Sequence, residues 1–123
     1  MTTRGIVLFA HGSRDAQWRE PVEAVARRVA EQDPSAQVRC AYLELVAPDL
    51  ATAVGELRAE GVSSVHVVPL FLGMGRHARE DLPLLMAQLR EQHPGVHFTQ
   101  APAVGQDPAV IDLLARLALA PHQ

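Results

Sequence analysis

The stretch Ile6-Val7-Leu8-Phe9-Ala10-His11-Gly12 decides the fold. Its unbroken apolar run is typical of a strand that is covered on both faces, as in a parallel sheet between helices. The run stops at a histidine and a glycine. Similar apolar runs follow at residues 38–45 and 65–72, with a shorter one at 96–99. We therefore predict four strands.

Segments with helical periodicity separate these runs. Apolar residues recur at steps of three and four in residues 18–29, 50–57, 82–89 and 110–117. Pro21 is expected in the first turn of the first helix, and residues 73–80 are expected to form a loop. Two helices are predicted to end at Asp33-Pro34 and at Gly61. Three helices are predicted to begin at Pro48-Asp49, Asp81 and Asp107-Pro108. In the last helix, Val110, Leu113, Leu114 and Leu117 are expected to face the core.

Alternating strands and helices imply right-handed crossovers and a parallel sheet with helices on both faces. The predicted fold is an α/β three-layer αβα sandwich with a four-stranded parallel sheet, of the flavodoxin-like or chelatase-like type. The chain has 123 residues, 48% of them hydrophobic, and no linker or repeat divides it. We therefore expect a single domain over residues 1–123.

Composition excludes several functional classes. The net charge is −3 without clustered cations, which argues against a nucleic-acid partner. No apolar stretch approaches the roughly 20 residues that cross a membrane, and the amino terminus is interpreted as a strand, not a signal peptide. The single Cys40 excludes an internal disulfide and fits a reducing compartment. We expect a cytoplasmic protein.

Three residues that can bind metals follow the predicted strands. His11 and His77 each come after an apolar run, and Glu44 lies at the end of another. The carboxyl ends of parallel strands share one edge, so the three side chains are expected to face one crevice. Two imidazoles and a carboxylate suit cobalt, iron or nickel, whereas the lack of thiolates disfavours a structural zinc site. Alternatively, the histidines are polar loop residues and Glu44 compensates a helix dipole.

Other polar residues have less specific interpretations. Arg14, Arg76 and Arg79 lie in the same loops and suit carboxylate recognition, although pairing with neighbouring Asp15, Glu80 and Asp81 is an alternative. The remaining histidines lie away from the expected crevice and are not predicted as ligands; they are His66, His93, His97 and His122. Trp18 and Cys40 are predicted to belong to the core.

The segment Gly73-Met74-Gly75-Arg76-His77-Ala78 formally matches a dinucleotide-binding fingerprint. It follows the third predicted strand, and no acidic residue ends a following strand, so a flavin or nucleotide site has only this weak support. The glycines instead suit close approach of the backbone to a bulky ligand.

Three motifs together resemble the CbiX-type sirohydrochlorin chelatases in their short, single-unit form. They are residues 9–15 (FAHGSRD), residues 42–45 (YLEL) ahead of Pro48, and residues 69–72 (PLFL) running into Gly75-Arg76-His77 and Asp81-Leu82-Pro83. The resemblance implies a homodimer that inserts a divalent metal, cobalt or iron, into sirohydrochlorin without ATP, for cobalamin or sirohaem synthesis. Nickel insertion is the alternative. His11 and His77 match the family's catalytic pair.

Metal insertion requires the removal of two pyrrole protons while water leaves the metal. Imidazoles can bind the ion or accept protons at cytosolic pH, so we assign these tasks to His11 and His77, with Glu44 assisting as ligand or proton acceptor. Arg14, Arg76 and Arg79 would meet the carboxylates of the macrocycle, and Leu72 and Met74 would cover its ring. We expect no tightly bound cofactor, since the metal is a substrate. A carrier of metal or tetrapyrrole without catalysis is the rival hypothesis.

Overall fold

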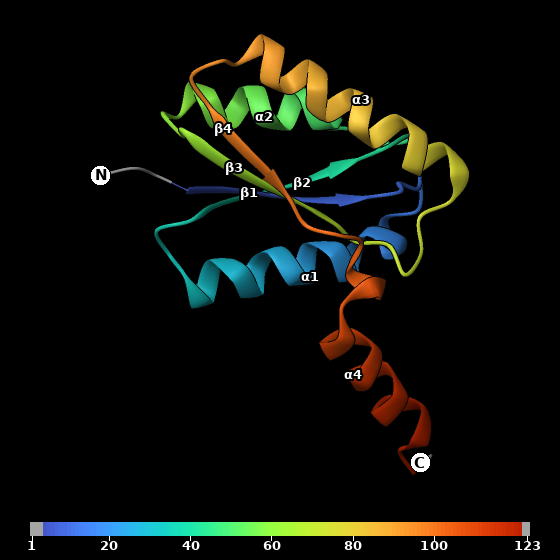
Figure 1. Cartoon of the computed structure of the whole chain (residues 1–123). Coiled ribbons are helices and arrows are strands. Elements are labelled where there is room, and N and C mark those ends of the chain that lie inside the picture. The colour runs from blue at the N-terminus through green and yellow to red at the C-terminus, as the bar shows by residue number, and fades with distance from the viewer. Residues whose placement is uncertain (1–3, 122–123) are drawn as a thin grey trace.

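A computed structural model describes residues 4–121. Its sheet contains β1 (Arg4–Ala10), β2 (Gln37–Tyr42), β3 (Ser64–Pro69) and β4 (His97–Gln100). The strand order is β2-β1-β3-β4, and every adjacent pair is parallel (Figure 1). The predicted four-stranded parallel sheet is confirmed.

Helices cover both faces of the sheet. Helix α1 (Ala16–Gln32) lies on one face, and α2 (Leu50–Ala59) and α3 (Arg76–Gln92) lie side by side on the other (Figure 1). A short 3₁₀ helix, η1 (Val104–Gln106), and α4 (Pro108–Leu119) follow β4. The three layers confirm the predicted αβα architecture.

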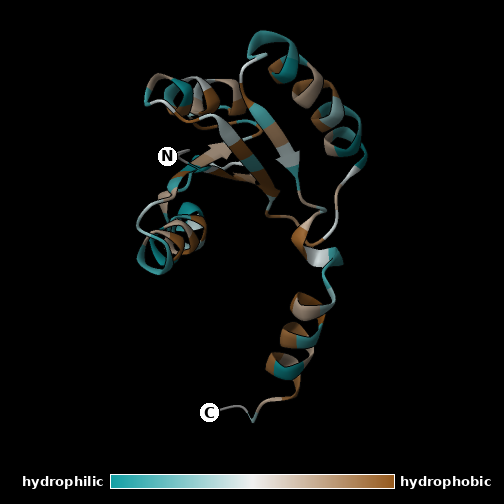
Figure 2. Ribbon diagram, turned by 60° about the vertical axis from the view of Figure 1, so that its left-hand side comes forward, coloured by the Kyte–Doolittle hydropathy of each residue, from teal (hydrophilic) through white to brown (hydrophobic). Residues whose placement is uncertain are grey.

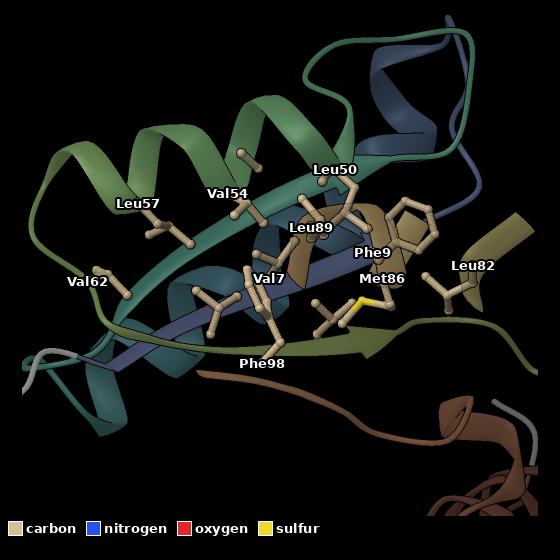
Figure 3. Close-up of a cluster of buried hydrophobic side chains, with 14 residues drawn as sticks. Val7, Phe9, Leu50, Val54, Leu57, Val62, Leu82, Met86, Leu89 and Phe98 are labelled. Atoms are coloured by element: carbon tan, nitrogen blue, oxygen red, sulfur yellow. The ribbon is translucent and has the colours of Figure 1, made fainter. Parts of the chain in front are cut away.

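The central strand β1 has side chains in both cores, because successive side chains of a strand point to opposite faces. Val7 and Phe9 belong to the larger cluster beneath α2 and α3 (Figure 3). Ile6 and Leu8 pack instead against the side of α1. From Ile6 to Ala10, every residue is at most 7% exposed, which explains why this run is apolar throughout. The carboxyl end of a rigid, buried strand therefore holds His11.

The third helix begins earlier than predicted. Residues 73–80 were expected to form a loop with a cap at Asp81, whereas α3 begins at Arg76 with Gly75 as its N-cap. The buried Ala78 stands four residues before the buried Leu82, so the apolar face extends a turn further toward the amino terminus. His77 therefore lies in the first turn of a helix.

Smaller predictions about α1 and the core were also wrong. Asp15 caps α1 by accepting a hydrogen bond from the backbone N–H of Gln17, so Pro21 lies inside the helix and not in its first turn. Trp18 is 38% exposed and packs against Tyr42, with ring centroids 6.3 Å apart. The prediction for Cys40 holds in part, because Cys40 packs against the cluster of Ala10, Val22 and Tyr42 and is partly buried.

Helix α4 begins where the sequence predicts, but it does not pack on the sheet. Asp107 accepts a hydrogen bond from the N–H of Ala109 at 2.8 Å, and Pro108 opens the helix. The helix then extends away from the sheet (Figures 1 and 2). None of its residues is buried, so the expected inward face of Val110, Leu113, Leu114 and Leu117 is wrong. Periodicity identifies an apolar face but not the surface that covers it.

Within residues 4–121, none of the helices combines the length and apolar character needed to span a membrane.

Candidate functional site

The side chains of His11 and Glu44 are in contact at the carboxyl edge of the sheet. Nε2 of His11 lies 2.9 Å from Oε1 of Glu44, and both side chains are slightly more than half exposed, at 56% and 53%. The pairing of β1 with β2 continues past the strand ends, because the N–H of Leu43 donates to the carbonyl of Ala10 and that of Glu44 donates to the carbonyl of His11. Backbone hydrogen bonds thus hold the two side chains together in an accessible position.

Gly12 permits this close approach of the two chain segments. Its φ is +111°, and a Cβ placed there would lie 1.9 Å from the carbonyl oxygen of Glu44. Only glycine fits without displacing the backbone of the Glu44 loop. The glycine that follows His11 is therefore part of the site's construction.

The loop that carries Glu44 contains a tight turn. The N–H of Val46 donates to the carbonyl of Glu44 at 2.9 Å, and the intervening Leu45 has a φ of +71°. A γ-turn with a left-handed central residue is rare, and it is strained for a leucine. Leu45 is also 52% exposed, so the turn presents an apolar side chain beside Glu44.

Phe71, which lies just after β3, supports the imidazole of His11. The rings of His11 and Phe71 meet edge to face, with centroids 6.5 Å apart. Phe71 also contacts Phe9 of β1 in the same manner at 6.1 Å. Packing on Phe71 and the contact with Glu44 together limit the rotation of the His11 ring.

The segment between β3 and α3 is also held in place by a contact with η1. The N–H of Gly105 donates to the carbonyl of Phe71 at 2.9 Å. A Cβ at residue 105 would lie 1.7 Å from the carbonyl oxygen of Leu72, so glycine is required there as well. This contact ties the chain before α4 to the loop that leads to His77.

His77 is exposed in the first turn of α3 and lies at the same edge of the sheet. Gly75 offers no side chain to cap this turn, so it satisfies none of the backbone N–H groups at the start of α3. Within residues 4–121, no group of three or more His, Cys, Asp or Glu side chains is arranged to hold a metal ion. The structure therefore brings His11 and Glu44 together, and His77 does not join them in such a group.

The predicted substrate-binding residues lie on the same open edge. Arg14, Arg76 and Arg79 are exposed, and Arg76 pairs with Glu80 at 3.1 Å, as the alternative interpretation expected. Leu72 is 70% exposed, while Met74 is partly buried against the core beneath α3. Leu72 can therefore contact a ligand directly, and Met74 only in part.

The family model described as CbiX matches residues 5–119. The chain belongs to the CbiX family. The sirohydrochlorin cobaltochelatase of Methanopyrus kandleri is 36% identical over 81 residues, which are 66% of this chain and 57% of that protein. That of Methanococcoides burtonii is 30% identical over 91 residues, 74% of this chain and 70% of the relative. The match to the Methanopyrus protein thus spans less than two thirds of its length.

Solved structures show the same architecture. A cobalamin (vitamin B12) biosynthesis CbiX protein from Marinobacter aquaeolei VT8 superposes with a TM-score of 0.80 at 37% identity, covering 94% of this chain and 93% of that one. The chelatase SirB from Bacillus subtilis subspecies spizizenii, crystallised with cobalt, superposes with a TM-score of 0.79 at 24% identity. The superposition covers 96% of this chain and 50% of the SirB chain. Half of the SirB chain therefore shares the fold of this CbiX chain.

Sequence reasoning missed four residues of this CbiX site: Gly12, Leu45, Phe71 and Gly105. Gly12 was quoted as the end of a strand run and within the motif of residues 9–15 but given no role, although a glycine directly after a buried strand is a signal for close backbone approach. Leu45 and Phe71 were read as strand residues. Their positions depend on where β2 and β3 end, and the observed strands end at Tyr42 and Pro69.

The described histidines outside the site have other partners or positions, as predicted. Nδ1 of His66 lies 2.6 Å from the hydroxyl of Thr99, and Nδ1 of His93 lies 3.1 Å from the guanidinium of Arg58. His97 is exposed on the edge strand β4. His122 lies outside the described residues.

Proposed function

We propose that this CbiX chain inserts a divalent metal ion, cobalt or iron, into sirohydrochlorin without ATP. The observation that carries the proposal is the exposed His11–Glu44 pair at the ligand-binding edge of a CbiX fold. Relatives of the family named sirohydrochlorin cobaltochelatase support the choice of macrocycle. The product would serve cobalamin or sirohaem synthesis in the cytoplasm, and no tightly bound cofactor takes part.

The spacing of His11 and Glu44 suits a shared metal ion. Two ligands that each lie about 2.1 Å from a metal, at right angles to one another, are roughly 3.0 Å apart. Nε2 of His11 and Oε1 of Glu44 are 2.9 Å apart, so one ion can bind both atoms with little movement of either side chain. With only two protein ligands, the ion keeps exchangeable positions for water and for the nitrogens of the macrocycle.

Insertion exchanges one divalent ion for two pyrrole protons, so the site must release the ion and remove both protons. Glu44 and His11 become free to accept a proton as the ion moves to the macrocycle, because each then regains a lone pair. His77, standing apart on α3, acts as a separate proton acceptor on the approaching ring. Separating the ion from a second base avoids competition between metal and proton for one nitrogen.

The edge around the pair provides contacts for an anionic macrocycle. Arg14, Arg76 and Arg79 offer guanidinium groups to its carboxylates, and the open start of α3 offers backbone N–H groups. The exposed Leu45 and Leu72 offer apolar surface to the ring, with Met74 behind them.

The proposed active species is a homodimer. The His11–Glu44 pair lies on an open edge, and more than half of each side chain is exposed to solvent. A second copy facing this edge would supply the opposite wall and exclude water from the bound metal, which strengthens its interactions with the macrocycle.

The test is anaerobic mixing of the purified protein with sirohydrochlorin and cobalt, iron or nickel in turn, followed by the absorbance of the macrocycle. We expect acceleration over the uncatalysed rate with cobalt or iron. Acceleration by nickel alone would support the alternative metal. Tight binding of metal or macrocycle without acceleration would contradict catalysis and identify a carrier.

A further inference from the structure

The imidazole of His11 needs more than Glu44 to keep its orientation. Both side chains are more than half exposed, and contacts between exposed side chains contribute little because water competes for the same groups. A metal ion that enters between Nε2 of His11 and Oε1 of Glu44 also replaces this contact. A support that lasts from the empty site to the metal-bound site therefore has to come from another residue.

Phe71 provides such a support. Its ring and the imidazole of His11 stand nearly at right angles, with an interplanar angle of 84° and centroids 6.5 Å apart. Aromatic rings attract one another in this edge-to-face arrangement. Phe71 has no atom that binds a metal, so its contact with His11 does not compete with the ion.

The ring of Phe71 is itself fixed by the hydrophobic core. It packs against Phe9 with an interplanar angle of 80° and a centroid distance of 6.1 Å. Phe9 is 1% exposed and belongs to the cluster beneath α2 and α3 (Figure 3). The three rings of Phe9, Phe71 and His11 therefore form a row that leads from the buried core to the open edge of the sheet.

Backbone hydrogen bonds hold Phe71 on both sides. The N–H of the preceding Leu70 donates to the carbonyl of Phe9 at 2.7 Å, which joins this segment to β1. The carbonyl of Phe71 accepts a hydrogen bond from the N–H of Gly105 at 2.9 Å, which joins it to η1. With its backbone held twice and its ring packed on the core, Phe71 is a rigid surface for an exposed side chain.

We propose that Phe71 is a positioning residue for metal binding, which holds the imidazole of His11 so that Nε2 faces Glu44 before the ion arrives. A ring that is already in place loses little conformational freedom when the ion binds, whereas a freely rotating ring has to be ordered at that step. The inference rests on the metal site of the proposed function, but it does not depend on the macrocycle or on catalysis.

Calorimetric titration of the full chain with cobalt alone tests the proposal. Phe71→Leu keeps an apolar side chain against the core but removes the ring, so cobalt affinity should fall by about tenfold, as is typical when a residue that orients a metal ligand is lost. Phe71→Tyr keeps the ring and should bind cobalt within about twofold of the parent protein. His11→Ala serves as the reference for loss of the site.

Phe98 offers a matched control, because it packs against a histidine outside the site. The rings of Phe98 and His93 have centroids 6.4 Å apart, Phe98 is 5% exposed, and His93 lies at the carboxyl end of α3. Phe98→Leu should lower the urea concentration at the midpoint of unfolding, since it removes a ring from the core, but it should leave cobalt affinity unchanged. Urea denaturation of every variant also ensures that cobalt is titrated into folded protein.

The imidazole signals of His11 in the proton NMR spectrum provide a second measurement that requires no metal. A neighbouring aromatic ring shifts these signals through its ring current, so Phe71→Leu should move them and Phe71→Tyr should restore the positions of the parent protein. The signals of His97, on β4, should stay in place in both variants. Unmoved His11 signals in Phe71→Leu would contradict the proposed contact.

Three results of the cobalt titrations would overturn the inference. Unchanged affinity in Phe71→Leu would show that His11 keeps its orientation without the ring. An equal loss in Phe98→Leu would show that cobalt binding follows overall stability. A loss in Phe71→Tyr as large as that in Phe71→Leu would show that the aromatic contact does not hold His11. If His11→Ala itself bound cobalt as tightly as the parent protein, the metal site of the proposed function would be refuted, and this inference with it.

Discussion

Nε2 of His11 and Oε1 of Glu44 lie 2.9 Å apart, although 33 positions separate the residues in the sequence. The contact results from the parallel register in which Ala10 lies opposite Tyr42, continued for two residues beyond the strands. The sheet thus sets the distance between the two groups before any metal arrives. This preorganisation leads to the first prediction.

Glu44→Gln should lower the rate of metal insertion by about 10- to 100-fold, the range typical of a lost metal-orienting carboxylate. The amide keeps the size of the Glu44 side chain and an acceptor oxygen, but it lacks the negative charge that attracts the ion. Cobalt affinity, measured by calorimetry without macrocycle, should fall in parallel. Glu56→Gln, on the exposed side of α2, serves as the matched control and should retain both properties. Unchanged cobalt affinity in Glu44→Gln would argue against its role as a ligand.

His77→Ala should reduce insertion strongly while leaving cobalt affinity close to that of the parent protein. The reason is that His77 does not join His11 and Glu44 in a group that could hold a metal ion, so we propose that it acts on the macrocycle rather than on the ion. His11→Ala, in contrast, should lose both activity and affinity. His93→Ala is the control, since this histidine lies at the opposite end of α3. Equal loss of cobalt affinity in the His77 and His11 variants would place both on the metal.

Gly12→Ala should destabilise the protein by about 2 kcal/mol or more, because the new Cβ would meet the carbonyl of Glu44 and the residue would keep a positive φ. Gly55→Ala is the matched control. It lies within α2 with nothing near its Cβ position, so it should stabilise the protein by up to about 1 kcal/mol. Urea denaturation measures both changes. A neutral effect at Gly12 would mean that the Glu44 loop moves freely.

The sequence was sufficient to predict the sheet and the placement of His11 and Glu44 at one edge of it. These follow from local patterns, namely the apolar run that ends at Ala10 and the parallel order of strands and helices. It could not predict that α4 would be uncovered, because Leu114 and Leu117 have the same spacing whether their cover is this chain or another. The start of α3 was missed because Gly75 is a poor sequence signal for an N-cap compared with Asp81. The turn at Leu45 was missed because nothing in a leucine indicates a left-handed backbone.

The stability contributed by the cap of α2 should depend on pH. Hydrogen bonds from the side chain and the backbone N–H of Thr52 hold the pKa of Asp49 below its ordinary value of 3.8. Because the folded-state pKa is the lower one, the contribution is complete above the unfolded-state value and is lost as the pH falls through the folded-state value. Asp49→Ala should therefore cost about 1 kcal/mol at pH 7, and the difference should shrink below pH 4. Denaturation at several pH values checks this, and a difference that persists undiminished at the lowest pH would contradict it.

Gly105→Ala should impair insertion although residue 105 bears no catalytic group. A Cβ there would lie 1.7 Å from the carbonyl of Leu72, so either η1 or the loop leading to His77 must shift. Because Leu72 is proposed to contact the macrocycle, we expect KM for sirohydrochlorin to rise by about tenfold. Gly95→Ala, which has open space around its Cβ position, is the control. A variant with a normal KM would show that η1 shifts and that the loop leading to His77 stays in place.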